Sequence, residues 1–207
     1  MKYRLILFDV DSTMTSTEGI DLMGELSPHG TQIADITRQA MEGSLDFESS
    51  IRARVALLKD LPETVTSAAA EASRISEGAE ETFKALKDQG FRIGLASGGF
   101  HEIIEKVFAG WNFDLIVAQR LHVAEGRLTG QLASPIVGRA EKAQALREFA
   151  GKYGIDLSET VAVGDGSNDI DMIRTAGLGI AYRAKAALRA VADHQIEDLR
   201  EIIPLVS

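Results

Sequence analysis

Short, largely apolar runs that alternate with amphipathic helical periods are the feature that most restricts the fold of this 207-residue chain. Five such runs end in turn-forming residues: 4–8, 91–96, 113–117, 160–163 and 178–181. Between them, apolar residues recur at three- and four-residue spacing, for example in residues 78–89 and 139–153. Buried parallel strands have this short apolar pattern, and their alternation with helices covers both faces of one sheet. The pattern predicts an α/β fold with a doubly wound parallel sheet.

Two intervals depart from this alternation. Residues 17–75 contain no strand-like run, only four helical stretches: 18–26, 31–41, 47–58 and 63–72. We therefore predict a core of residues 1–15 and 77–207 and a small helical cap domain of residues 16–76, inserted after the first strand. A second insert, residues 121–137, is predicted to form a β-hairpin with its tight turn at Glu125-Gly126.

Composition narrows the classes of partner. The formal net charge is -9, which argues against a nucleic-acid partner because such proteins need a basic surface to displace counterions from phosphates. The chain has no cysteine, so disulfides and thiolate metal sites are excluded, and a reducing compartment fits. No apolar run approaches the ~20 residues of a membrane span. We predict a cytoplasmic protein with no membrane partner, either a monomer or a homodimer.

Polar residues follow three of the predicted strands. Asp9 and Asp11 follow the first, residues 97–99 (SGG) the second, and residues 164–169 (GDGSND) the fourth. The carboxyl ends of parallel strands lie at one edge of a sheet, where ligands bind, so we expect the three clusters to converge. Asp, Ser, Asn and Gly also cap helices and turns without any ligand. Three clusters that include four aspartates make capping alone an insufficient explanation.

Several carboxylates brought together need a cation, and Mg²⁺ fits because it prefers hard oxygen ligands and works beside phosphates. The clusters contain no histidine or cysteine, which disfavours zinc. A bound phosphate would also need hydrogen-bond donors and a cation. The donors can come from Ser97 and from the amides of Gly98 and Gly99 at an expected helix start. Lys142, near the start of its helix, is the candidate for this cation. Considered alone, it would be interpreted as a solvent-exposed helix lysine. Lys152 and Lys185 are the alternatives.

In chain order, these motifs resemble the four motifs of the haloacid dehalogenase superfamily. They are FDVDST (residues 8–13), SGG (97–99), Lys142 and GDGSND (164–169). The predicted insert resembles the helical cap of the phosphoserine phosphatase family through Glu18 and three runs: ITRQAMEG (36–43), LDF (45–47) and RARVALL (52–58). The resemblance covers essentially the whole chain.

The resemblance implies hydrolysis of O-phospho-L-serine to L-serine and phosphate, the last step of serine biosynthesis, through an aspartyl-phosphate intermediate. Asp9 is then the nucleophile, Asp11 the general acid and base, and Lys142 the cation that holds the phosphoryl group. Mg²⁺ is held by the Asp9 carboxylate, the Asp11 backbone carbonyl and Asp165. Asp169 orients Lys142 or the waters of the metal.

The same resemblance assigns the substrate contacts. Ser97 and Gly98 bind the phosphoryl oxygens, and Asn168 contacts the substrate. Four residues of the cap select the substrate: Arg54 for its carboxylate, Glu18 for its ammonium group, and Met41 and Phe47 as a dry lid. Glu18 also has a simpler explanation, because Glu near a helix start is favoured without a ligand, and Met41 and Phe47 are residue types more often found in the core.

Other functions stay open to comparison. A phosphatase or phosphotransferase for another small phosphomonoester, such as phosphothreonine, homoserine phosphate or a sugar phosphate, would use the same chemistry. A sugar phosphate offers no neighbouring ammonium and carboxylate for Glu18 and Arg54. A receiver domain that only accepts a phosphoryl group needs neither Asp11 nor the long insert. A dinucleotide oxidoreductase is disfavoured because ASGGF (residues 96–100) does not match G-x-G-x-x-G.

Overall fold

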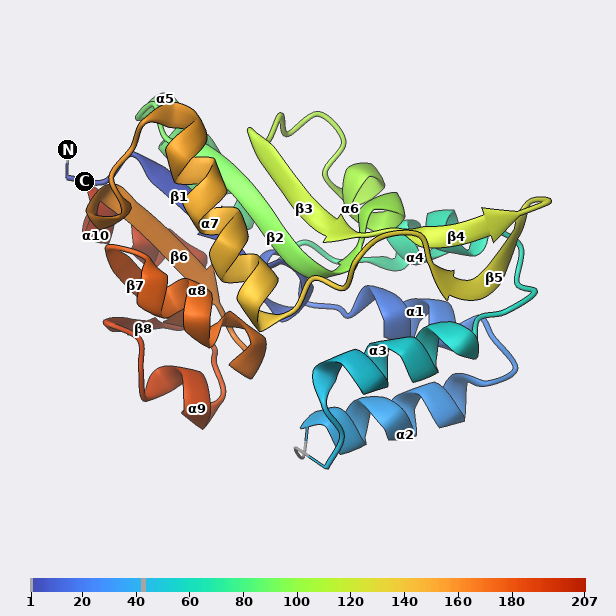
Figure 1. Ribbon diagram of the computed structural model, residues 1–207. Helices are drawn as coiled ribbons and strands as arrows, with labels where there is room; N and C mark the ends of the chain where they lie inside the picture. Colours follow the sequence, from blue (N-terminus) through green and yellow to red (C-terminus); the bar gives the residue numbers. More distant parts are fainter. Residues whose placement is uncertain (1, 42–43) are drawn as a thin grey trace.

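The computed structural model describes residues 2–41 and 44–207 and is centred on a six-stranded parallel sheet (Figure 1). The strand order is β3-β2-β1-β6-β7-β8. The bounds of the strands are Leu5–Phe8 (β1), Arg92–Phe100 (β2), Leu115–Gln119 (β3), Thr160–Gly164 (β6), Leu178–Tyr182 (β7) and His194–Ile196 (β8). The chain therefore has the predicted doubly wound α/β fold, with β1 in the middle of the sheet.

Helices cover both faces of this sheet, as the alternation of side chains along β1 requires. Leu5 and Leu7 pack with α7 (Arg139–Tyr153), α8 (Ile170–Thr175) and α9 (Ala186–Arg189). Ile6 and Phe8 point to the other face, where α5 (Ala79–Asp88), α6 (His101–Val107) and α10 (Ile202–Val206) lie. Among the described residues, no helix is both long enough and apolar enough to cross a bilayer.

The interval after β1 is helical, as predicted, and shares a hydrophobic cluster with the hairpin. Its helices are α1 (Gly19–Glu25), α2 (Gly30–Met41), α3 (Phe47–Ala56) and α4 (Val65–Ala72). Ile33, Ile51 and Ala69 from three of these helices join Leu121 and Leu128 of the hairpin in one buried cluster. The exact division of the chain at residues 16 and 76 stays a prediction.

The predicted hairpin is confirmed. Its strands are β4 (Leu121–Ala124) and β5 (Arg127–Leu132), paired antiparallel. Glu125 and Gly126 both have positive φ, 51° and 72°, as a two-residue type I′ turn requires. The hairpin contacts the segment between α3 and α4, where Asp60 N–H donates to Leu128 O at 2.9 Å.

Two details of the sheet differ from the prediction. The second strand does not stop at residue 96 but continues to Phe100, with an irregular register between Ala96 and Phe100, and the next helix begins at His101. The glycines of this segment allow such a bulge. The second difference is the edge strand β8, which the sequence pattern missed because HQI contains only one apolar residue.

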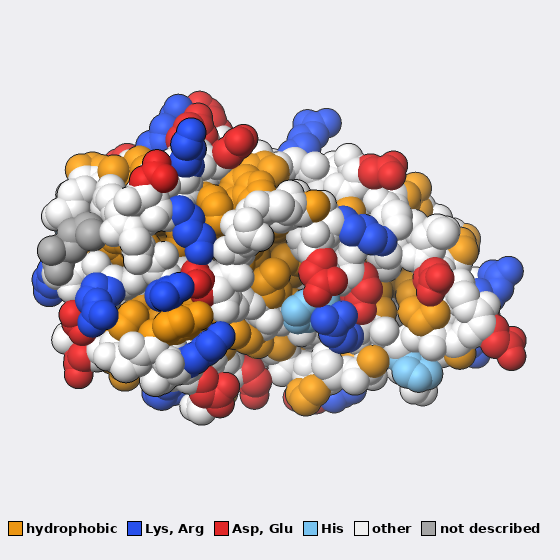
Figure 2. Space-filling view, turned by 90° about the horizontal axis from the view of Figure 1, so that it is seen from above, with side chains coloured by type: hydrophobic (Ala, Val, Ile, Leu, Met, Phe, Trp, Pro, Cys, Tyr) orange, Lys and Arg blue, Asp and Glu red, His pale blue; other side chains and the backbone are white. Residues whose placement is uncertain are grey.

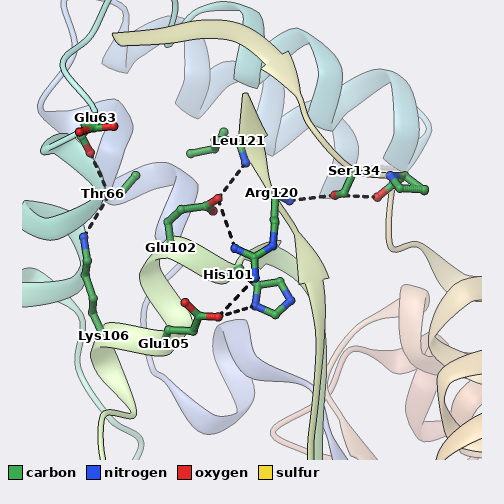
Figure 3. Close-up of polar contacts among 10 residues, drawn as sticks. Glu63, Thr66, His101, Glu102, Glu105, Lys106, Arg120, Leu121 and Ser134 are labelled. Carbon is green, nitrogen blue, oxygen red and sulfur yellow. Dashed lines mark hydrogen bonds and ion pairs between the residues drawn. The ribbon is translucent and has the colours of Figure 1, made fainter. Parts of the chain in front are cut away.

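A polar network joins α6, which follows β2, to the hairpin and to α4 (Figure 3). Glu102 of α6 accepts a hydrogen bond from Leu121 N–H at 3.3 Å and lies 4.0 Å from the Arg120 guanidinium. Lys106 donates to Ser67 Oγ of α4 at 2.6 Å. Polar contacts with the hairpin and with the insert therefore fix the position of α6.

The surface seen from above in Figure 2 carries lysine and arginine side chains interspersed with aspartate and glutamate. They do not gather into one basic area on this face. This mixed distribution agrees with the net charge of -9.

Candidate active site

A cavity of about 430 Å³ lies at the carboxyl ends of the strands and is closed on one side by residues of α1, α2 and α3. The three polar clusters converge there, as predicted. The proposed site residues that line it are Asp9, Asp11, Glu18, Phe47, Arg54, Gly98, Asp165 and Asn168. Three more, Ser97, Lys142 and Asp169, are completely buried beside it.

Lys142 lies between two carboxylates at the base of the cavity. Its Nζ is 2.5 Å from Asp9 Oδ1 and 2.7 Å from Asp169 Oδ1. β1 places Asp9, whose backbone N–H donates to Val163 O at 2.9 Å, and the first turn of α7 places Lys142. Burial by itself would lower the pKa of Lys142, but the charges of Asp169 and Asp9 outweigh burial and raise it above its ordinary value. The lysine therefore stays charged.

Three carboxylates crowd together at this base. One oxygen each of Asp9, Asp165 and Asp169 lies within 4.8 Å of the others. Burial, and then the charge of Asp169, raise the pKa of Asp165 to about 6. Burial also raises the pKa of Asp9, and Lys142 only partly opposes the effect. A buried set of hard oxygen donors that repel one another fits a divalent cation such as Mg²⁺.

Asp169 differs from Asp9 and Asp165 because both of its carboxylate oxygens already accept hydrogen bonds from the protein. Oδ1 accepts from Lys142, while Oδ2 accepts from the backbone N–H groups of Asp165 and Gly166 at 3.2 and 3.0 Å. Asp9 and Asp165 line the cavity, whereas Asp169 does not. This geometry suits Asp169 to fixing Lys142 and the loop at residues 165–166, and the catalytic role of Asp169 stays a prediction.

Asp11 follows in a wide turn, residues Val10–Met14, closed by a hydrogen bond from Thr15 N–H to Val10 O at 2.9 Å. Val10, between the two aspartates, is buried in the core. The Asp11 carboxylate accepts from Gly19 N–H at 3.0 Å. Burial, followed by the nearby charge of Glu18, raises the pKa of Asp11 to about 7. A carboxyl group with such a pKa can both donate and accept a proton near neutral pH.

The segment at the end of β2 presents Ser97 and two glycines to the cavity. Gly99 N–H donates to Ser97 Oγ at 2.8 Å, so the serine hydroxyl keeps its own proton for another acceptor. A Cβ at Gly98 would lie 2.6 Å from Cζ of Phe47, so a larger residue there would require the ring to move. Gln119, at the end of β3, donates to Gly98 O. Sequence reasoning missed Gln119, although a polar residue at the end of an apolar strand was the available signal.

Arg54 is buried in the wall opposite the carboxylates. Its Nη1 donates to Thr37 Oγ1 at 3.2 Å and its Nε to Ser50 O at 3.4 Å. Among the residues that the structure describes, no carboxylate lies within 4.0 Å of its guanidinium nitrogens. Burial lowers the pKa of Arg54, and the charges of Asp21, Glu18 and Asp11 oppose the shift. This guanidinium is therefore a buried cation that can receive an anion from the cavity.

Glu18 and Phe47 complete the side of the cavity formed by the insert. Glu18 accepts a hydrogen bond from the Ser12 hydroxyl at 2.7 Å, and Phe47 begins α3, whose N-cap is Asp46. Met41 is the last residue of α2, and its side chain lies outside the described part of the chain.

Comparison with known proteins gives the family. Residues 6–174 match the haloacid dehalogenase-like hydrolases. The chain belongs to this family. Within it, the chain is 44% identical over 207 residues to the phosphoserine phosphatase of Methanocaldococcus jannaschii, covering 99% of this chain and 98% of that one. It is 48% identical over 190 residues to phosphoserine phosphatase SerB2 of Mycobacterium tuberculosis. The aligned region is 92% of this chain but only 46% of the relative.

A solved structure supports the same grouping. It is described as a phospho-aspartyl intermediate analogue of phosphoserine phosphatase, and it superposes with a TM-score of 0.93 at 43% identity over the full length of both chains. This chain is thus a haloacid dehalogenase-like hydrolase of the phosphoserine phosphatase group.

Of the three lysines considered for the motif of this family, only Lys142 reaches Asp9. Lys152 is exposed near the other end of α7, where its Nζ lies 5.1 Å from the Tyr153 ring centroid. Lys185 is exposed at the rim of the cavity, and its backbone N–H donates to Asp165 O at 3.0 Å.

Proposed function

We propose that this chain is a magnesium-dependent phosphoserine phosphatase that hydrolyses O-phosphoserine to serine and phosphate. The observation that carries the proposal is the pairing of two features in one cavity. Asp9 lies against Lys142 at its base, and Arg54, which has no carboxylate partner within the described parts of the chain, lies in the wall formed by the insert. A substrate with a phosphate at one end and a carboxylate at the other meets both.

In the first half of the reaction, a carboxylate oxygen of Asp9 attacks phosphorus. The bond between phosphorus and the serine oxygen breaks, and the phosphoryl group passes to Asp9 as an acyl phosphate. Asp11 gives its proton to the departing serine oxygen, which is too basic to leave as an alkoxide. Lys142 offsets charge on the phosphoryl oxygens, while Ser97 and the Gly98 amide donate hydrogen bonds to them.

In the second half, a water molecule attacks the phosphorus of the Asp9 acyl phosphate. Asp11, now a carboxylate, takes the proton of this water, phosphate leaves, and the Asp9 carboxylate is restored. The Asp9 and Asp165 carboxylates and the Asp11 backbone carbonyl would hold Mg²⁺, which supplies positive charge to the phosphoryl group. Asp169 keeps Lys142 in place through the 2.7 Å contact.

Selection of the substrate falls to the side of the cavity opposite Asp9. Arg54 binds the carboxylate with paired N–H donors, and Glu18 pairs with the ammonium group. Phe47 forms the apolar lid that keeps bulk water out during transfer, and Asn168 contacts the substrate. We place the enzyme in the cytoplasm, as a monomer or homodimer, at the last step of serine biosynthesis.

The test is phosphate release from a panel of phosphomonoesters. Phosphoserine, phosphothreonine, a sugar phosphate and p-nitrophenyl phosphate are compared at equal concentration, with Mg²⁺ and with excess EDTA. We expect the highest kcat/KM for phosphoserine and no turnover with the chelator until Mg²⁺ is restored. Equal turnover of all four esters would refute the selection by Arg54 and Glu18 even if the metal dependence held.

A further inference from the structure

Three helices of the insert contribute residues to one hydrogen-bond network, which ends at Arg54. Thr37 of α2 receives a hydrogen bond from Arg54 Nη1 of α3 at 3.2 Å. The same hydroxyl lies 2.9 Å from Oδ1 of Asp21, which belongs to α1. Thr37 and Arg54 are only 8% and 7% exposed, and Asp21 is half-buried, so the bond between Thr37 and Arg54 is the better shielded from water.

The single hydroxyl proton of Thr37 determines which groups in this network donate and which accept. A hydroxyl has a single proton and two lone pairs, and a guanidinium only donates. Thr37 Oγ1 therefore accepts from Arg54 and donates its own proton elsewhere. Two acceptors are in reach, the Asp21 carboxylate at 2.9 Å and Ile33 O at 3.1 Å. The charged and nearer acceptor makes the stronger bond.

We propose that Thr37, backed by the Asp21 carboxylate, is a positioning residue that fixes the direction in which Arg54 meets the carboxylate of the substrate. This inference rests on the proposed function. The Asp21 carboxylate holds the threonine hydroxyl that accepts from Arg54, and its charge also acts on the guanidinium through space. Arg54 keeps more N–H donors than its contacts with Thr37 and Ser50 use, and these remain for the ligand.

The physical need for such a residue comes from the length of the arginine side chain. A free arginine loses rotamer entropy when a ligand fixes it, and a loss of about 1.4 kcal/mol corresponds to a tenfold weaker binding constant. Two hydrogen bonds from different helices fix the guanidinium before the ligand arrives. The loss of either bond should therefore appear in binding of the carboxylate and not in the chemistry at Asp9.

The experiment compares Thr37→Val, which keeps the shape but removes the hydroxyl, with Thr37→Ser, which keeps the hydroxyl. Thr31→Val is the matched control, because Thr31 is an exposed threonine of the same helix. Two substrates are measured with each protein: phosphoserine and O-phosphoethanolamine, which has the phosphate and the ammonium group but no carboxylate.

For Thr37→Val we expect KM for phosphoserine to rise about tenfold while kcat changes less than about twofold. We expect kcat/KM for phosphoethanolamine to stay within about twofold, and Thr37→Ser and Thr31→Val to behave like the wild type. An unchanged KM for phosphoserine, an equal loss on both substrates, or a serine variant as poor as the valine variant would overturn the proposal. If the valine variant does not fold, Asp21→Asn takes its place, with the same selective rise in KM expected and the same overturning results.

The two proposals fail in different ways. If the wild type shows no preference for phosphoserine over phosphoethanolamine, the proposed function fails and the role of Thr37 fails with it. If the wild type prefers phosphoserine and Thr37→Val keeps that preference, only the role of Thr37 fails.

Discussion

The carboxylate of Asp11 occupies the space that a side chain at Gly99 would need. A Cβ at position 99 would lie 2.5 Å from Asp11 Oδ2 and 3.1 Å from Ser97 Oγ. Gly99→Ala should therefore push Asp11 out of its place and reduce kcat at least about tenfold, with a loss of about 1–3 kcal/mol in the free energy of unfolding. Steady-state kinetics and urea unfolding of the variant measure both.

The matched control is Gly151→Ala in α7, where nothing lies within 4 Å of the added Cβ. Alanine in a helix should leave activity unchanged and raise stability by up to about 1 kcal/mol. Equal kinetic losses in the two alanine variants would mean that the contact with Asp11 has no part in catalysis.

Asp9→Asn should eliminate steady-state turnover of phosphoserine, because a neutral amide does not attack phosphorus. Mass spectrometry of acid-quenched reactions should find a phosphoryl group on Asp9 of the wild type and none on the variant. Measurable turnover by the variant, or an adduct on another residue of the wild type, would contradict the covalent route.

Lys142→Met should abolish activity and destabilise the fold by about 3–5 kcal/mol, because it leaves the buried Asp9 and Asp169 carboxylates without their cation. Lys152→Met removes an exposed lysine of the same helix and should change the free energy of unfolding by less than about 0.5 kcal/mol. Urea unfolding without metal measures both variants. Similar stabilities for the two would show that Lys142 does not neutralise the buried carboxylates.

Arg54→Ala should lower kcat/KM for phosphoserine by about 10- to 100-fold, because the substrate carboxylate loses charged hydrogen bonds. The loss for p-nitrophenyl phosphate should be much smaller, since this ester has no carboxylate. Arg52→Ala is the control, because Arg52 is exposed and pairs with Glu48 at 2.8 Å on the outer face of the same helix. Parallel losses on both esters would remove Arg54 from substrate selection.

Asp114 should make stability depend on pH. Burial alone would raise its pKa, but hydrogen bonds from Lys87, Ile93 N–H and Arg92 outweigh burial and hold the pKa below its ordinary value. A group whose pKa is lower in the folded state stabilises the fold above its ordinary pKa, and this contribution disappears as pH falls through the folded value.

Wild type and Asp114→Asn should therefore differ most in free energy of unfolding near about pH 6, and the difference should shrink below about pH 4. Urea unfolding at a series of pH values measures it. A difference that stays constant with pH would mean that the ion pairs of Asp114 contribute nothing to folding.

Local patterns were sufficient for the sheet and for the strand-end part of the site. Apolar runs predicted five of the six strands, and the rule that parallel strands end at one edge brought Asp9, Asp11, Gly98 and Asp165 to one cavity. β8 escaped because a short, mostly polar edge strand has no apolar run. The bulge after Ala96 escaped because two glycines are compatible with a turn, a helix start or a continued strand.

By itself, the amino-acid sequence determined where strands and helices form and which chemical groups stand at their ends, because hydrophobic periodicity and turn preference act between near neighbours. Only the tertiary structure decided which of those groups meet. Lys142 and Lys152 share one helix and look alike in sequence, yet one is completely buried against Asp9, 133 residues away, and the other is exposed. Likewise, the contacts of Arg54 with Thr37 and of Thr37 with Asp21 exist only once three helices have packed. Contacts of this kind depend on how elements far apart in the chain pack, which local residue preferences do not encode.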